Sequence, residues 1–159
     1  MLRLLGQQLG EADGHTVAYQ LLEKLWQEET GKPFPTIART EKGKPYFSGE
    51  KLHFSITHTK TCAFCALSDR PVGIDAEPLT RKINPAHAQK LLSPEEYMQY
   101  ENATDPNRAL LTFWVLKEAA GKCEGKGLQL WPNHTEFSLD DSRVQELSGC
   151  IVAVVEKKM

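Results

Sequence analysis

The sequence predicts an α+β fold with a largely antiparallel sheet. Segments with helical spacing of apolar residues and segments with strand-like composition occur in separate runs, not in the strict alternation that produces a parallel sheet. The strand-like segments are short, and turn residues separate them. The chain has 159 residues, of which 40% are hydrophobic, so it can bury the core of one domain or of two small halves.

The first predicted helix covers residues 15–30, because its apolar residues recur at one-turn spacing. Gly31 and Pro33 follow it and end the helical pattern. The apolar positions are Val17, Ala18, Leu21, Leu22, Leu25 and Trp26. We expect this stripe to face the core.

Three short strands are predicted next. Residues 43–47 (GKPYF) are typical of a turn that leads into a strand, and residues 52–59 and 62–68 are two further strands with polar residues between them. Residues 69–71 then turn the chain into the short apolar segment 72–75 (VGID).

Helices dominate the region that follows. Residues 93–96 (SPEE) form a capping box with proline at the first helical position. Asp105 and Pro106 begin a long apolar helix, which should end at Gly125 or Gly127.

Two closing strands are predicted at residues 134–139 (HTEFSL) and 150–156 (CIVAVVE). The second is strongly apolar and should lie in the core.

Charge and hydropathy exclude several classes of protein. The net charge is −2, from 19 basic and 21 acidic side chains, so no overall field would attract nucleic acid or an anionic membrane. The first 15 residues lack the apolar stretch of a signal peptide, and no apolar run reaches 18 residues. We therefore expect a cytoplasmic protein that binds neither nucleic acid nor membrane.

The four cysteines raise the possibilities of a zinc site or a disulfide framework. Cys62 and Cys65 form a C-x-x-C pair, but residues three apart in a strand point to opposite faces. Cys123 and Cys150 supply no second close pair. Buried reduced thiols are the favoured interpretation, and a zinc or redox protein built on Cys62 and Cys65 is kept as an alternative.

Two segments combine charge with apolar surroundings. Residues 72–77 (VGIDAE) deliver Asp75 and Glu77 at a strand end, where alternation points both carboxylates to one side. In residues 114–122 (WVLKEAAGK), Trp114, Glu118 and Lys122 lie four apart and share a helix face, with Lys117 beside them. Three carboxylates can hold magnesium, which prefers oxygen ligands. Taken alone, an acid and a lysine four residues apart on a helix most often form a solvated ion pair.

Together the two segments resemble the signature motifs of the 4'-phosphopantetheinyl transferase superfamily, a G-[IV]-D-x-E strand end and a W-x-x-K-E-x-x-x-K helix. Three further segments resemble its surfactin-type branch. Residues 43–45 match its G-K-P turn, and residues 124–128 match E-G-K-G-L. Residues 54–59 (FSITHT) resemble F-N-[IL]-S-H-[ST], with serine and threonine replacing asparagine and serine.

This branch places two similar α+β halves in one polypeptide, which implies halves at residues 1–70 and 71–159 in one compact unit. Its members carry amino-terminal basic residues that meet coenzyme A. We expect this chain to be shortened there, since residues 13–16 (DGHT) stand where an arginine would begin the first helix. Both sides of the expected cleft lie in one chain, which favours a monomer.

The resemblance implies transfer of the 4'-phosphopantetheine group from coenzyme A to a serine of an apo acyl or peptidyl carrier protein. It implies Mg²⁺, or Mn²⁺, held by Asp75, Glu77 and Glu118. The implied catalytic residues are Asp75, Glu118 and Lys122, with Glu118 as candidate general base. The phosphates of coenzyme A are expected to meet Lys44, His58, Arg81, Lys82 and Lys122, with Arg39 as a further candidate. The alternative is a protein of the same fold that binds coenzyme A without transferring the group.

Overall fold

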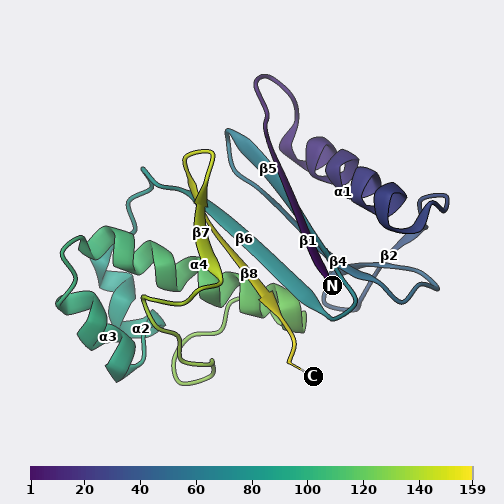
Figure 1. Ribbon diagram of the computed structural model, residues 1–159. Helices are drawn as coiled ribbons and strands as arrows, with labels where there is room; N and C mark the ends of the chain where they lie inside the picture. The colour runs from purple at the N-terminus through teal and green to yellow at the C-terminus, as the bar shows by residue number, and fades with distance from the viewer. Residues whose placement is uncertain (159) are drawn as a thin grey trace.

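Strand β5 (Cys62–Ser68) forms the centre of the first of two three-stranded antiparallel sheets. It lies between β1 (Leu2–Gln8) and β4 (His53–His58). Helix α1 (Gly14–Thr30) covers the outer face of this sheet, and β2 (Ile37–Arg39) pairs with β3 (Pro45–Phe47) in a separate hairpin (Figure 1). The computed structural model describes residues 1–158.

Strand β8 (Cys150–Glu156) forms the centre of the second sheet, between β6 (Val72–Pro78) and β7 (Val144–Leu147). Helix α4 (Pro106–Glu124) covers the outer face of this sheet. Between β6 and α4 the chain forms the 3-10 turn η1 (Pro85–His87) and the helices α2 (Ala88–Leu91) and α3 (Pro94–Glu101).

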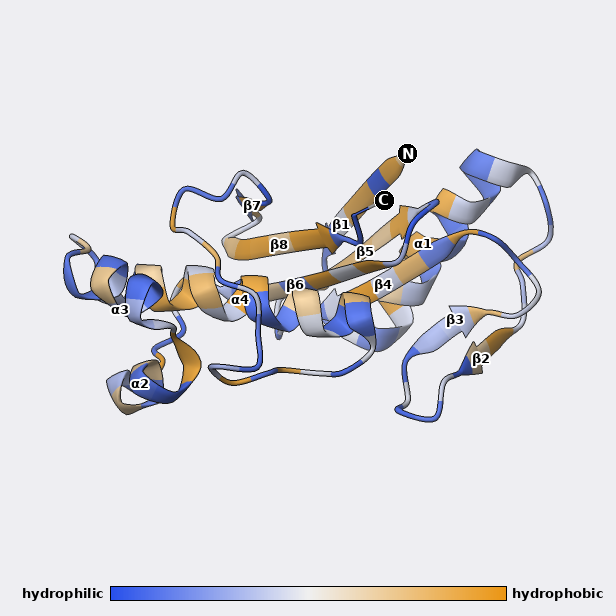
Figure 2. Cartoon of the chain, turned by 90° about the horizontal axis from the view of Figure 1, so that it is seen from below, coloured by the Kyte–Doolittle hydropathy of each residue, from blue (hydrophilic) through white to orange (hydrophobic). Residues whose placement is uncertain are grey.

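The two sheets pack face to face, so that the layers are α1, first sheet, second sheet and α4. Strand alternation explains this order, because successive side chains of a strand point to opposite faces. In β5, Ala63, Cys65 and Leu67 pack with α1, whereas Cys62, Phe64 and Ala66 pack against the second sheet. In β8, Ile151, Ala153 and Val155 pack with α4, whereas Cys150, Val152 and Val154 pack against the first sheet. Figure 2 shows the resulting hydrophobic band of strands through the middle of the molecule.

Most predicted elements are confirmed, including the helix predicted at residues 15–30, which begins one residue earlier at Gly14, the capped helix at Ser93 and the long helix that ends at Gly125. The strands β1 and β2 were not anticipated.

The strand predicted at residues 134–139 is wrong, and the nearest strand is β7. Side chains of α3 satisfy the backbone there in place of a neighbouring strand. The Phe137 N–H donates to Glu96 Oε2 at 2.7 Å, and the Leu139 N–H donates to Gln99 Oε1 at 3.0 Å.

The four cysteines are free and buried. Cys62 packs between the sheets and Cys65 packs towards α1, so the C-x-x-C pair does point to opposite faces. No helix in the described part of the chain is long and apolar enough to cross a membrane.

Candidate active site

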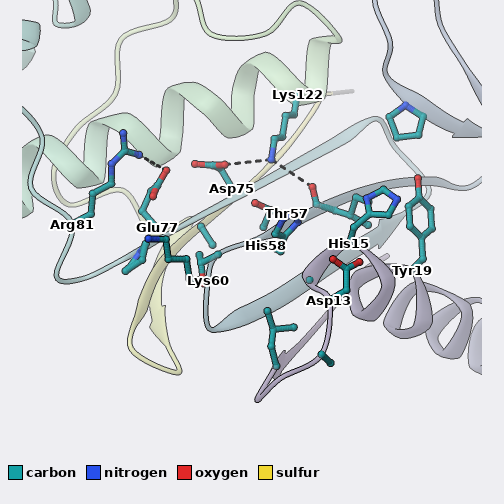
Figure 3. A pocket seen from close by; sticks show the side chains of 18 of the residues that line it. Asp13, His15, Tyr19, Thr57, His58, Lys60, Asp75, Glu77, Arg81 and Lys122 are labelled. Atoms are coloured by element: carbon teal, nitrogen blue, oxygen red, sulfur yellow. Dashed lines mark hydrogen bonds and ion pairs between the residues drawn. The ribbon is translucent and has the colours of Figure 1, made fainter.

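A cleft of about 1250 Å³ lies beside the ends of β4 and β6 (Figure 3). One wall comes from the start of α1, from Arg39 and from the end of β4, and the other comes from the end of β6 and from α4. Its polar and charged lining residues are Asp13, His15, Tyr19, Arg39, Thr57, His58, Thr59, Lys60, Asp75, Glu77, Thr80, Arg81 and Lys122.

Alternation along β6 aims two carboxylates at α4. Val72, Ile74 and Ala76 pack between the sheets, so Gly73, Asp75 and Glu77 face the opposite side, towards the helix. Gly73 is required there, because a Cβ at this position would lie 1.9 Å from the Ala119 carbonyl oxygen and 2.5 Å from the Cys123 nitrogen. The bare glycine backbone therefore lets α4 approach β6 closely enough for helix side chains to reach the carboxylates.

Lys122 reaches Asp75 from α4. Its Nζ lies 3.3 Å from Asp75 Oδ1, and it also donates to the carbonyl oxygens of Ile74 at 3.0 Å and Ile56 at 3.4 Å. Since Ile56 belongs to β4 and Ile74 to β6, this single ammonium group links α4 to one strand of each sheet.

Asp75 is 7% exposed, and its second carboxylate oxygen, Oδ2, is buried without a hydrogen-bond partner. Burial raises the pKa of Asp75 to about 7, which the nearby Lys122 opposes and the nearby Glu118 and Glu77 reinforce. A buried oxygen with no donor is energetically costly, so this atom is available to a cation or a proton.

Glu77 is held by Arg81. Arg81 Nη1 lies 2.5 Å from Glu77 Oε1, and the guanidinium carbon lies 5.0 Å from the centre of the Trp114 ring. Figure 3 shows this pair at one side of Asp75 and Lys122 at the other.

Glu118 is half-buried on α4 and does not contribute to the lining of the cleft. Burial raises the pKa of Glu118, while Lys122 and Arg81 act in the opposite direction. Glu118 contributes to the raised pKa of Asp75, but of the three predicted carboxylates only Asp75 and Glu77 line the cleft.

The opposite wall carries His58, as predicted, together with residues that sequence reasoning missed. The start of α1 lies directly against His58, since a Cβ on Gly14 would come within 2.7 Å of its ring. The rings of His15 and Tyr19 pack edge to face with centroids 4.9 Å apart. The residues DGHT, which were noted only as a departure from the family pattern, therefore form part of the cleft. Arg39, a secondary candidate, lines it as well.

Two predicted phosphate contacts lie outside the lining of the cleft. The Lys44 ammonium donates to the carbonyl oxygens of Cys123 at 3.0 Å and Val72 at 3.4 Å, and burial lowers its pKa. A contact between Lys44 and a ligand would require the ammonium to leave these carbonyls. Lys82 is exposed, and its side chain is not among those that line the cleft.

Lys117, the first lysine of the helix motif, belongs to a different group. It is fully buried with Glu96, and its Nζ lies 2.7 and 2.9 Å from the two Glu96 oxygens. His134 Nδ1 lies 2.8 Å from the same ammonium. The side chain of His134 is buried in this network. The network fastens α3 and the segment near Phe137 to α4.

The donor set fits a hard divalent cation. Asp75, Glu77 and Glu118 offer only oxygen ligands, as Mg²⁺ and Mn²⁺ prefer, and Asp75 Oδ2 has no other partner. The three carboxylates do not converge on a common position in this structure, since no group of three or more metal-ligating side chains is assembled among residues 1–158. Glu77 would have to turn from Arg81 to join a cation at Asp75.

Comparison with known proteins agrees with the motifs. The family model of the 4'-phosphopantetheinyl transferase superfamily matches residues 71–153, just over half of the chain. A 4'-phosphopantetheinyl transferase of Aneurinibacillus migulanus is 30% identical over 109 residues, which cover 67% of this chain and 44% of that protein. A Bacillus subtilis 4'-phosphopantetheinyl transferase is 34% identical over 96 residues, or 57% of this chain and 41% of the relative. Another from Bacillus pumilus is 29% identical over 127 residues, or 79% and 50%. The chain thus spans about half the length of the curated relatives it matches.

Proposed function

Because this chain belongs to the 4'-phosphopantetheinyl transferase superfamily, we propose that it transfers the 4'-phosphopantetheine group of coenzyme A to a serine of an apo acyl or peptidyl carrier protein. The observation that carries this proposal is the meeting of Asp75, Glu77, Arg81 and Lys122 with His58 across one cleft. A pyrophosphate needs cations and a metal-binding carboxylate set in one place, and this cleft offers both.

In the proposed reaction the serine Oγ attacks the β-phosphorus of coenzyme A. A new P–O bond forms, the bond from the β-phosphorus to the bridging oxygen breaks, and adenosine 3',5'-bisphosphate leaves. The serine proton passes to a carboxylate. Glu118 remains the candidate base, directly or through water, since burial raises its pKa. A metal-bound carboxylate is a weaker base, so this role competes with binding of the cation.

A divalent cation, Mg²⁺ or Mn²⁺, would be held by Asp75 Oδ2 with Glu77 and Glu118, and it would neutralise charge on the pyrophosphate. Lys122 fixes the Asp75 carboxylate through Oδ1 and so leaves Oδ2 for the cation. His58, Arg39 and Arg81 line the cleft and are the proposed phosphate contacts. Since both walls come from one chain, we propose that a monomer suffices.

The test is incubation of the protein with coenzyme A, Mg²⁺ and a panel of apo carrier proteins, followed by intact-mass measurement of each carrier. The proposal predicts the addition of one phosphopantetheine group to at least one carrier. Coenzyme A binding without modification of any carrier would instead support a binding protein of the same fold.

A further inference from the structure

Contacts of both its side chain and its backbone hold Arg81 in place. Its guanidinium pairs with Glu77 and lies over the Trp114 ring. Its backbone N–H donates to the Pro78 carbonyl at 3.0 Å, and its carbonyl oxygen accepts from Asn107 Nδ2 at 2.8 Å. Because Asn107 and Trp114 both belong to α4, the turn after β6 is fixed to the helix that carries Glu118 and Lys122.

The two cationic side chains in this part of the cleft, Lys122 and Arg81, contact their carboxylates at different distances. Each cation contacts one oxygen of its carboxylate, but Arg81 Nη1 lies 2.5 Å from Glu77 Oε1, whereas Lys122 Nζ lies 3.3 Å from Asp75 Oδ1 and leaves Oδ2 without a partner. A divalent cation would have to compete with this guanidinium for Glu77, since two positive groups cannot share one carboxylate without mutual repulsion.

The guanidinium can leave Glu77 for an anion. The Arg81 side chain is 39% exposed and lines the cleft, and the planar guanidinium matches phosphate oxygens in bidentate geometry. A phosphate ligand would thus remove the competitor from Glu77 and supply negative charge beside the cation.

We propose that Arg81 is a resident counter-ion of Glu77 that competes with the divalent cation and is withdrawn by the phosphates of the ligand, so that metal and phosphate ligand bind cooperatively. This inference rests on the proposed function. Coupling between two ligands is reciprocal, so the metal should strengthen phosphate binding by the same factor. Arg81 is in this account a positioning residue for the metal ligands, not solely a phosphate contact.

The test measures Mn²⁺ binding by electron paramagnetic resonance and calorimetry, with and without adenosine 3',5'-bisphosphate. In wild-type protein the nucleotide should tighten Mn²⁺ binding about fivefold or more. Without nucleotide, Arg81→Gln should bind Mn²⁺ about fivefold more tightly than wild type. In this variant the nucleotide should tighten Mn²⁺ binding only slightly further. In a Glu77→Gln background, Arg81→Gln should no longer tighten Mn²⁺ binding.

Arg70→Gln is the matched control. Arg70 pairs with Glu156 at 3.1 Å with side-chain exposures of 34% and 16%, close to the 39% and 19% of Arg81 and Glu77, but it lies outside the cleft lining. It should leave Mn²⁺ binding unchanged, which separates a local effect from a change in net charge.

Equal or weaker Mn²⁺ binding by Arg81→Gln in the absence of nucleotide would overturn the inference, as would an undiminished effect of the nucleotide in that variant. Either result would leave the transferase proposal intact, because transfer to a carrier is measured separately. If wild-type protein binds neither Mn²⁺ nor the nucleotide, both proposals fail.

Discussion

The Lys122 ammonium lies 3.3 Å from Asp75 Oδ1 and leaves Oδ2 of the same carboxylate buried without a partner. Lys122 therefore orients the Asp75 carboxylate but leaves one of its two oxygens without a hydrogen bond. A half-satisfied buried carboxylate costs free energy in the folded protein, and such sites are typical of functional clefts.

Asp75→Asn should stabilise the protein at pH 8 in the presence of EDTA. The folded-state pKa of Asp75 is about 7, above its unfolded value of about 4. The stability associated with the protonated side chain is therefore fully present below pH 4 and is lost progressively as pH rises to about 7. We expect the variant to gain about 4 kcal/mol in free energy of unfolding at pH 8 and only about 1–2 kcal/mol at pH 5.

Denaturant titration at the two pH values measures this difference, with Asp140→Asn, an exposed aspartate outside the cleft, as control. A difference that is equal at pH 5 and pH 8 would show that Asp75 does not titrate in this range.

Glu118→Gln should lower transfer about 100-fold or more, the range expected for loss of a general base, and should leave the circular dichroism spectrum unchanged because the residue is only half-buried. Glu124→Gln is the control, since Glu124 is an exposed glutamate on the same helix. If the two variants transfer at similar rates, Glu118 has no part in the chemistry.

Lys117→Met should lower the free energy of unfolding by about 3–5 kcal/mol, because it leaves the buried Glu96 carboxylate without its cation. Lys126→Met removes an exposed ion pair with Glu124 and should change stability by less than about 1 kcal/mol. Thermal unfolding compares the two. Similar stability of both variants would mean that the Lys117 network does not hold α3 to α4.

Gly73→Ala should lower stability by about 2–3 kcal/mol or more, because the new methyl group would overlap the backbone of α4 at Ala119. The helix must shift to relieve this overlap, and Lys122 would move away from Asp75. Transfer should therefore fall even in the fraction that remains folded. A folded variant with normal transfer would show that the close packing of β6 on α4 does not position the site.

The elements with regular apolar spacing could be predicted from the sequence, as could the carboxylates of β6 and the Lys122 face of α4. The segment at residues 134–139 could not, because its hydrogen bonds go to Glu96 and Gln99, which lie about 40 positions earlier. The clamp of Arg81 between Glu77 and Trp114 and the position of His15 beside the cleft likewise depend on how separate elements pack. Sequence spacing within one element gives no signal for such contacts.

The most direct test of the central claim is the intact mass of an apo carrier protein after incubation with coenzyme A, Mg²⁺ and either wild-type protein or Asp75→Ala. We predict that wild type adds one phosphopantetheine group, that EDTA abolishes the addition, that Mn²⁺ restores it, and that folded Asp75→Ala leaves the carrier almost unmodified. Equal modification by both proteins, or modification that persists after thorough chelation, would contradict the assignment of this cleft as a metal-dependent transferase site.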